Sequence, residues 1–274
     1  MPELPEVETV RRMLIPLTVG KTIQDIKVFW PNIIKRPDDV AMFAEMLKGQ
    51  SIRTVERRGK FLKFVLTEHV LISHLRMEGR YLLQTTGMPV EPHTHVIFQF
   101  TDGTELRYRD VRKFGTMHVF RIGEEDEHLP LSQLGPEPFS PSFTPELLMT
   151  KLQKTNRKIK NVLLDQTVVA GIGNIYADEV LFRAKVHPER IASSIKTEEV
   201  ERLHQEIIVT LQEAVEKGGS TVRTYVNTQG EAGTFQLQLF VYGRKGEPCK
   251  RCGHPVQKIT VAGRGTHYCE QCQQ

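Results

Sequence analysis

The chain begins with Met1-Pro2-Glu3-Leu4-Pro5-Glu6-Val7-Glu8. Removal of Met1 would leave a secondary amine on Pro2, and an α-amino group with an ordinary pKa of about 8 is partly unprotonated near neutral pH. Such an amine can attack an aldehyde-level carbon to give a Schiff base, with Glu3 beside it as a general acid or base. The alternative is structural, because a proline at a helix start followed by acidic residues also suits the helix dipole.

Apolar spacing after this stretch predicts a first domain built mainly from strands. Val7, Val10 and Leu14 recur at helical spacing, so we expect a helix to about Leu14. Alternating apolar and polar residues then predict short strands at residues 26–30, 60–66, 70–75, 96–100, 106–108 and 116–122. Repeated short strands are typical of a β-sandwich or barrel, and we assign residues 2–131 to this domain.

Prolines mark the end of this domain, and a helical region follows them. Five prolines lie between residues 130 and 145, which predicts a linker. Apolar residues then recur at helical spacing to about residue 217, with Thr197 as the N-cap of the clearest helix. Gly171 and Gly173 form a turn between two helical segments, which suits a helix–turn–helix domain over residues 135–225.

The four cysteines lie near the end of the chain in the pattern Cys249-x2-Cys252-x16-Cys269-x2-Cys272. Two Cys-x-x-Cys pairs at this separation predict one tetrahedral Zn²⁺ bound by four thiolates. A closed site of this kind leaves no open coordination position, so we expect a structural zinc in a domain covering residues 238–274. The alternative, four unrelated buried cysteines, does not account for the doubled spacing.

Between the cysteine pairs, residues 256–268 have the pattern of a hairpin with Gly263-Arg264-Gly265 at its turn. An arginine at a glycine-flanked tip is well placed to reach a phosphate. An ordinary solvent-exposed turn arginine has the same spacing, so both interpretations stand.

Basic residues alternate with aromatic or apolar residues at two other turns. The stretch 107–115 contains Arg112 and Phe114, and this mixture suits phosphate binding together with an apolar wedge inserted between stacked bases. Met77, in the stretch 74–79, could be a second wedge. For Phe114 and Met77, packing in the core is the alternative.

Three further polar residues have equally open interpretations. Lys60 enters a strand after Arg57-Arg58-Gly59, and Lys160 lies in a basic helix; a solvated face is the usual meaning of such cations. Asn174 follows the glycine turn, where it could contact a phosphate or cap the next helix.

The distribution of charge and apolar residues limits the partners of the protein. Residues 240–274 hold six of the 37 basic residues and two of the 33 acidic residues, so the net charge of +4 lies entirely in this segment. A local basic patch favours a polyanion. No apolar run approaches the roughly 20 residues of a membrane helix, and no signal peptide is visible, so we expect a cytoplasmic protein without a membrane partner.

Taken together, three of these segments resemble bacterial formamidopyrimidine-DNA glycosylases. They are Pro2-Glu3-Leu4-Pro5-Glu6, Gly171-Ile172-Gly173-Asn174-Ile175-Tyr176 and the four-cysteine segment. The resemblance implies an α+β multidomain fold: an N-terminal β-sandwich with an N-terminal helix, a helix–two-turn–helix domain and a C-terminal zinc finger. It also implies a bifunctional enzyme of base excision repair. Such an enzyme removes oxidised purines, namely 8-oxoguanine and formamidopyrimidines, from damaged double-stranded DNA and then cleaves the abasic strand by β,δ-elimination.

The same resemblance implies a role for individual residues. Pro2 matches the nucleophile at the deoxyribose C1′, and Glu3 matches its acid–base partner. Lys60 matches the lysine of proton transfer in β-elimination, and Arg264 the phosphate-binding arginine of δ-elimination. The positions that contact DNA are matched by His93, Arg112, Lys160 and Asn174. The trio that fills the gap left by the extruded nucleotide is matched by Met77, Arg112 and Phe114. A further phosphate-contact lysine of the family falls on Asn156 and stays unassigned.

We expect a monomer without a nucleotide cofactor, in which the glycine-rich residues 218–233 close over the flipped base as a lid does. Two alternatives remain. A sister enzyme of the same fold removes oxidised pyrimidines, although Leu4 stands where that sister family usually has glycine. A non-catalytic zinc-ribbon protein that binds DNA would need no amine on Pro2 and would form no covalent adduct.

Overall fold

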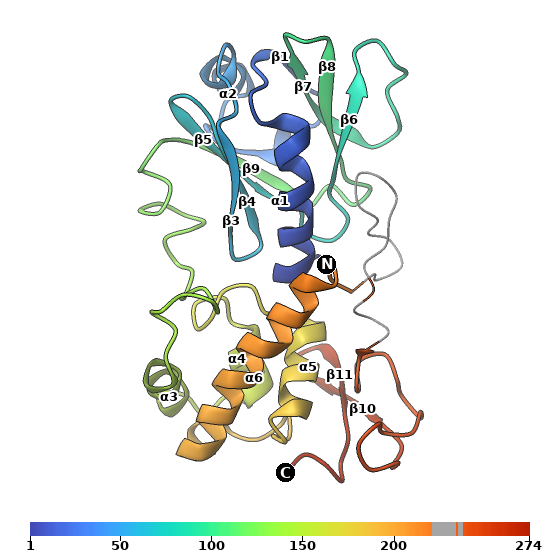
Figure 1. Cartoon of the computed structure of the whole chain (residues 1–274). Coiled ribbons are helices and arrows are strands. Elements are labelled where there is room, and N and C mark those ends of the chain that lie inside the picture. Colours follow the sequence, from blue (N-terminus) through green and yellow to red (C-terminus); the bar gives the residue numbers. More distant parts are fainter. Residues whose placement is uncertain (221–233, 235–237) are drawn as a thin grey trace. The chain divides into compact units, whose positions relative to one another are not determined.

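The computed structural model describes residues 1–220, 234 and 238–274, which belong to two compact units (Figure 1). The first is Met1–Ser132, and the second is Gln133–Ser220 with Thr234 and residues 238–274. The predicted lid, residues 218–233, lies outside the described residues from residue 221 onward. Within the described ranges, no helix is long and apolar enough to cross a membrane.

The first unit is a sandwich of two sheets preceded by a helix. One sheet has the antiparallel order β1-β7-β8-β6; the other has the order β2-β9-β5-β4-β3, in which β2 runs parallel to β9. The elements are α1 Leu4–Thr18, β1 Ile23–Val28, η1 Pro31–Ile33, β2 Ile34–Arg36, α2 Val40–Leu47, β3 Thr54–Arg58, β4 Phe61–Val65, β5 His69–His74, β6 Arg80–Thr85, β7 Thr94–Phe100, β8 Thr104–Arg109 and β9 Thr116–Arg121. The predicted sandwich is therefore confirmed.

Helix α1 is part of the core of this unit. Its residues Val7, Val10 and Leu14 belong to one buried cluster with apolar residues from both sheets. Two features stabilise the start of the helix at Leu4. Pro5 lies in the first turn, and the Glu6 carboxylate accepts the backbone N–H of Glu3 at 2.8 Å in a capping box. The N-terminus of the chain is thus anchored to the sandwich.

Five elements of this unit were not predicted, namely η1, β2, α2, β3 and β6. Helix α2 has eight residues, too few for a clear helical period, and Asp39 caps it by accepting the N–H of Met42 at 2.7 Å. Strand β3 buries Val55 alone, and its charged residues hide the alternation. Short elements with few buried positions leave little signal in a sequence.

The second unit contains helices followed by a hairpin. The elements are α3 Pro145–Gln153, α4 Ile159–Leu164, α5 Asn174–Arg183, η2 Ala192–Ser194, α6 Thr197–Glu216, β10 Gln257–Val261 and β11 Arg264–Tyr268. The prediction that Thr197 is the N-cap of α6 is wrong by one residue. Lys196 is the cap, because the Glu199 carboxylate accepts its backbone N–H at 2.9 Å and Thr197 joins the first turn.

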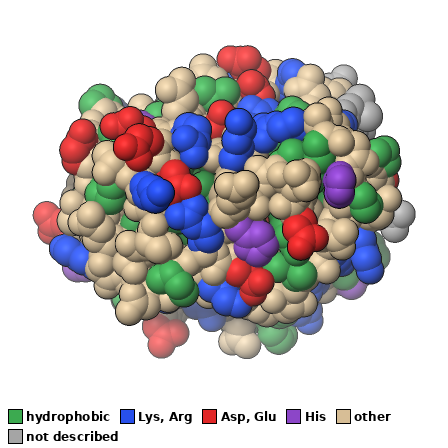
Figure 2. Space-filling view, turned by 90° about the horizontal axis from the view of Figure 1, so that it is seen from below, with side chains coloured by type: hydrophobic (Ala, Val, Ile, Leu, Met, Phe, Trp, Pro, Cys, Tyr) green, Lys and Arg blue, Asp and Glu red, His purple; other side chains and the backbone are tan. Residues whose placement is uncertain are grey.

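Charged side chains of both signs are interspersed on the face shown in Figure 2. Several cations of the C-terminal segment also make internal contacts. Arg244 pairs with Glu247 at 2.8 Å, and the guanidinium carbon of Arg251 lies 4.5 Å from the ring centroid of Phe182. Part of the basic excess in residues 240–274 is therefore used to hold the segment in place.

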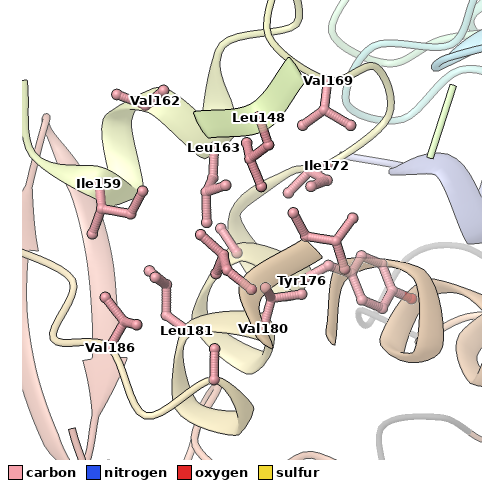
Figure 3. Packing of buried hydrophobic residues seen from close by; sticks show 14 of the residues in the cluster. Leu148, Ile159, Val162, Leu163, Val169, Ile172, Tyr176, Val180, Leu181 and Val186 are labelled. Carbon is pink, nitrogen blue, oxygen red and sulfur yellow. The ribbon is translucent and has the colours of Figure 1, made fainter. Parts of the chain in front are cut away.

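The core of the second unit lies between its helices (Figure 3). Leu148 of α3, Leu163 of α4 and Leu181 of α5 are at most 1% exposed and point toward one another. Val169 and Ile172, from the turn before α5, belong to the same cluster. The predicted glycine turn is confirmed, since Gly171 has a φ of +96° and lies between α4 and α5.

Glu179 of α5 fixes the segment that leads to the C-terminal hairpin. Its carboxylate is fully buried and accepts the backbone N–H groups of Phe240, Val241 and Tyr242 at 2.8, 2.9 and 2.9 Å. Burial raises the pKa of this carboxyl, although the three N–H groups favour its anion.

We expect Glu179→Gln to lower the free energy of unfolding by about 1–3 kcal/mol, because an amide NH₂ would face at least one N–H donor. Glu213→Gln is the matched control. The Glu213 carboxylate is 39% exposed and pairs with Arg183, so its loss should cost within about 0.5 kcal/mol. Denaturant unfolding measures both variants. Wild-type stability of Glu179→Gln would show that these bonds do not hold the segment.

Candidate functional site

Pro2 and Glu3 are buried at the start of α1, whereas Met1 is 39% exposed. Glu3 is the N-cap residue of the helix and is 3% exposed. Because α1 is anchored in the sandwich core, the two buried residues at its start are held at a defined place. The structural alternative for this stretch, a capped helix start, is also realised, so both interpretations apply to the same residues.

Lys60 lies in the tight turn between β3 and β4. The preceding Gly59 has a φ of +57°, which favours glycine, and the Arg57 guanidinium donates to the Gly59 carbonyl at 2.9 Å. Lys60 is only 6% exposed. The alternative of a solvated cation is therefore wrong for Lys60, because a buried ammonium group must be held by polar partners.

His74, at the end of β5, is a neighbour of Lys60 that sequence reasoning missed. Burial lowers the pKa of His74 to about 3, and the positive charges of Arg76 and Lys60 add to the effect. Its Nδ1 accepts the backbone N–H of Arg76 at 2.9 Å, so the neutral ring carries its proton on Nε2. The available signal was its place at the start of the stretch 74–79 that carries Met77.

The predicted wedge residues occupy two turns of the first unit. Arg112 and Phe114 lie between β8 and β9, and Phe114 is 51% exposed, so its core alternative is wrong. The guanidinium carbon of Arg112 lies 4.7 Å from the Phe114 ring centroid. Met77 is half-buried in the turn between β5 and β6, and His93 is exposed just before β7.

Lys160 and Asn174 come together at the hairpin of the second unit. Both donate to the carbonyl of Gly265, at 3.3 Å from Lys160 Nζ and 3.0 Å from Asn174 Nδ2. Lys160 is fully buried, and its Nζ also binds Asp178 Oδ1 at 2.6 Å and Thr266 Oγ1 at 2.7 Å. The solvated-face alternative for Lys160 is wrong, and a DNA contact by this residue stays a prediction.

Asn174 is the first residue of α5, and the N-cap of this helix is Gly173. The alternative of Asn174 as the cap is therefore wrong. Its amide instead ties the start of α5 to the residue that follows Arg264, so a side chain expected to contact DNA also connects the helical region with the hairpin.

Arg264 is exposed at the first position of β11. Strands β10 and β11 are joined by Ala262 and Gly263, with φ of +52° and +69°, as in a type I′ hairpin. The predicted hairpin is confirmed, but the predicted turn is wrong: the turn is Ala262-Gly263, and Arg264 and Gly265 belong to β11. The strand is anchored to α5, because Asp178 Oδ2 accepts the backbone N–H of His267 at 2.7 Å.

The four cysteine sulfurs lie within 4.8 Å of one another and form no disulfide. Cys249 Sγ is 3.9 Å from Cys272 Sγ, and Cys252 Sγ is 3.5 Å from Cys269 Sγ. Tetrahedral Zn²⁺ with Zn–S bonds of about 2.3 Å separates its ligands by roughly 3.8 Å. The four thiolates therefore fit one structural Zn²⁺, as their spacing predicted.

Three known sequence families match successive parts of the chain. Residues 1–117 match the formamidopyrimidine-DNA glycosylase N-terminal domain, residues 134–226 match the H2TH domain of the same proteins, and residues 246–274 match the zinc finger found in FPG and IleRS.

Relatives of similar length cover the whole chain. The formamidopyrimidine-DNA glycosylase of Geobacillus kaustophilus is 66% identical over 273 residues, with 100% of both chains covered. That of Bacillus cereus is 60% identical, with 100% of this chain and 99% of the relative covered.

Solved structures of proteins bound to damaged DNA also match nearly the whole chain. The complex of Lactococcus lactis Fpg with DNA containing an abasic site has a TM-score of 0.92 at 45% identity, covering 99% of both chains. A complex of MutM with DNA containing carbocyclic 8-oxo-G has a TM-score of 0.91 at 44% identity, covering 100% of both chains.

A β-sandwich, a helix–two-turn–helix domain and a four-thiolate zinc finger, in this order, define a DNA glycosylase of base excision repair. The chain belongs to the formamidopyrimidine-DNA glycosylase family.

We expect removal of zinc, by chelation or by Cys249→Ser, to abolish DNA binding while the first unit stays folded, because the metal holds the hairpin that carries Arg264. Binding to a duplex in a gel-shift assay and the near-UV circular dichroism of the protein measure the two effects. Normal DNA affinity of the metal-free protein would contradict this role.

We expect stability to fall as the pH drops below about 6.5, where an unfolded histidine takes up a proton. Folded His74, with a pKa of about 3, stays neutral there, so the unfolded state binds more protons. For this one histidine the loss is roughly 1 kcal/mol between pH 7.5 and 5.5. Thermal unfolding at both pH values should show a smaller loss for His74→Gln than for the wild type; equal losses would exclude His74 as the source.

Proposed function

We propose that this glycosylase removes oxidised purines from duplex DNA and then cleaves the abasic strand by β,δ-elimination. The observation that carries the proposal is the placement of Pro2 and Glu3, buried side by side at the anchored start of α1. Solved relatives bound to DNA with an abasic site, with Fapy-dG and with carbocyclic 8-oxo-G support this choice of substrate.

The chemistry begins at the Pro2 nitrogen once Met1 has been removed. The nitrogen attacks C1′ of the damaged nucleotide, the bond between C1′ and the base breaks, and the base leaves with a proton. Glu3 serves as the acid–base partner while the sugar ring opens and an iminium forms between Pro2 and C1′. A zinc ion held by the four cysteines would have no open coordination position, so it would serve the fold rather than this chemistry.

Strand cleavage follows from the iminium. Loss of a proton from C2′ expels the 3′ phosphate, and a second elimination expels the 5′ phosphate. Lys60 transfers protons in the first of these steps. Arg264 binds the phosphate in the second, for which its exposed place beside a rigid type I′ turn is suited.

Attack at C1′ requires that the damaged nucleotide leave the duplex, because the target atom is buried in the base stack. Extrusion costs a few kcal/mol, which an apolar wedge and phosphate contacts offset. Met77, Arg112 and Phe114 fill the gap, and His93, Lys160 and Asn174 contribute DNA contacts. Lys160 also supports the hairpin, through its bonds to Thr266 and to the Gly265 carbonyl. The domains are residues 2–131, 135–225 and 238–274, and the enzyme acts as a cytoplasmic monomer without a nucleotide cofactor.

We expect borohydride to trap a covalent protein–DNA adduct at the N-terminal peptide, because the proposed iminium is reducible. Pro2→Gly should keep a primary amine and some activity, whereas retention of Met1 should block the chemistry. Glu3→Gln should lower base release by about 10²–10⁴-fold yet still bind DNA. Intact mass of the purified protein establishes the state of its N-terminus.

The position of the trapped peptide decides between mechanisms. An adduct on Lys60 or another lysine, with Pro2 unmodified, would exclude the N-terminal amine as nucleophile. Release of oxidised pyrimidines in preference to 8-oxoguanine from matched duplexes would assign the chain to the sister activity, and absence of any adduct would favour a non-catalytic DNA-binding protein.

A further inference from the structure

Asp110 occupies the centre of the turn that carries Arg112 and Phe114. The residue is 1% exposed, and its carboxylate accepts three backbone N–H groups. Oδ1 accepts the backbone N–H of Arg112 at 3.0 Å, and Oδ2 accepts the backbone N–H groups of Phe114 and Gly115 at 2.8 Å each. Residues 111–114 are all exposed, so this buried carboxylate is an internal anchor for a turn whose side chains face solvent.

The turn needs such an anchor because its backbone is strained. Lys113 has a φ of +58°, a conformation that is unfavourable for a residue with a side chain. The surrounding bonds must maintain it. The backbone of Asp110 is itself fixed, since its N–H donates to the carbonyl of His93 at 3.0 Å and its carbonyl accepts from His95 Nε2 at 2.7 Å. Asp110 therefore also connects the turn to the backbone of His93.

Tyr108 links this turn to the second turn, which carries Met77. A Cβ atom added at Gly115 would lie 1.8 Å from the Tyr108 hydroxyl oxygen, and one added at Gly79 would lie 2.2 Å from the same atom. Both glycines thus lie directly against one buried tyrosine, which belongs to the sandwich core. Gly79 closes the Met77 turn by donating its N–H to the Leu75 carbonyl at 2.9 Å.

We propose that Asp110 is the positioning residue of the wedge and acts on Arg112 and Phe114 through their backbone N–H groups. Tyr108 packs against Gly79 and Gly115 and thereby holds the Met77 turn beside the turn of Arg112 and Phe114. Asp110 itself contacts neither the base nor the sugar. It fixes the backbone from which the side chains of Arg112 and Phe114 enter the DNA. The proposal rests on the wedge role proposed above for Met77, Arg112 and Phe114.

The test compares two duplexes that contain the same 8-oxoguanine. In one the lesion faces cytosine, and in the other it faces an abasic position, where there is no base pair to break and no partner base to support. Asp110→Asn replaces one carboxylate oxygen by an NH₂ group, which would face at least one of the three backbone N–H donors and so lose that hydrogen bond. We expect kcat/KM for the lesion opposite cytosine to fall about 10- to 100-fold, with the value opposite the abasic position within about threefold of wild type.

Asp102→Asn is the matched control. Asp102 stands just before the other end of β8 and accepts the backbone N–H of Thr104 at 3.0 Å, so it also bonds a turn beside this strand. We expect Asp102→Asn to behave as the wild type on both duplexes. Should Asp110→Asn fail to fold, Asp110→Glu keeps the charge but displaces the acceptor atoms, and it should show the same dependence on the opposing base.

A double-mutant cycle with Phe114→Ala separates the possible failures. If Asp110 acts through the wedge, Asp110→Asn adds little to the loss caused by Phe114→Ala, whereas independent effects multiply. Multiplied effects, or equal losses on both duplexes for Asp110→Asn, would overturn the positioning role and leave the wedge intact. If Phe114→Ala itself lowers activity equally on both duplexes, the wedge proposal fails and the role of Asp110 fails with it.

Discussion

The buried ion pair between Lys160 and Asp178 is the constraint on which the second unit depends. Both side chains are fully buried, so their removal from water is costly, and a pair of this kind persists only when every remaining donor and acceptor is satisfied. Here the Lys160 ammonium group also donates hydrogen bonds to Thr266 and to the Gly265 carbonyl, and the Asp178 carboxylate also accepts the backbone N–H of His267. The interaction joins α4, α5 and β11, so these elements must form together.

Carboxylates that bind backbone N–H groups occur at three places where the described chain leaves regular structure. Glu6 does so at the start of α1, Asp110 at the wedge turn and Glu179 at the segment that leads to the hairpin. Segments without a ladder of backbone bonds need other partners for their N–H groups. An anion suits this task because it accepts several donors at once, and it thereby makes an exposed turn as well defined as a strand.

The sequence predicted features that depend on spacing, and it missed features that depend on contacts between distant residues. The cysteine spacing led to the metal site and the hairpin, because the ligands of a metal must recur at fixed intervals. Nothing near Lys160 in the sequence indicates Asp178 or Thr266 as partners, so its burial could not be predicted. Likewise Asp110 was visible only as one acid within a basic stretch, and its three bonds to the backbone appear only once the turn has formed.

The close approach of Tyr108 to two glycines has an evolutionary consequence. Because the hydroxyl oxygen occupies the space that a methyl group would need at both Gly79 and Gly115, the three positions cannot vary independently. A lineage that replaced either glycine would first have to shorten the tyrosine, and a lineage that lost the tyrosine would leave a void beneath two loops at once. Drift at these sites should therefore be slow and correlated.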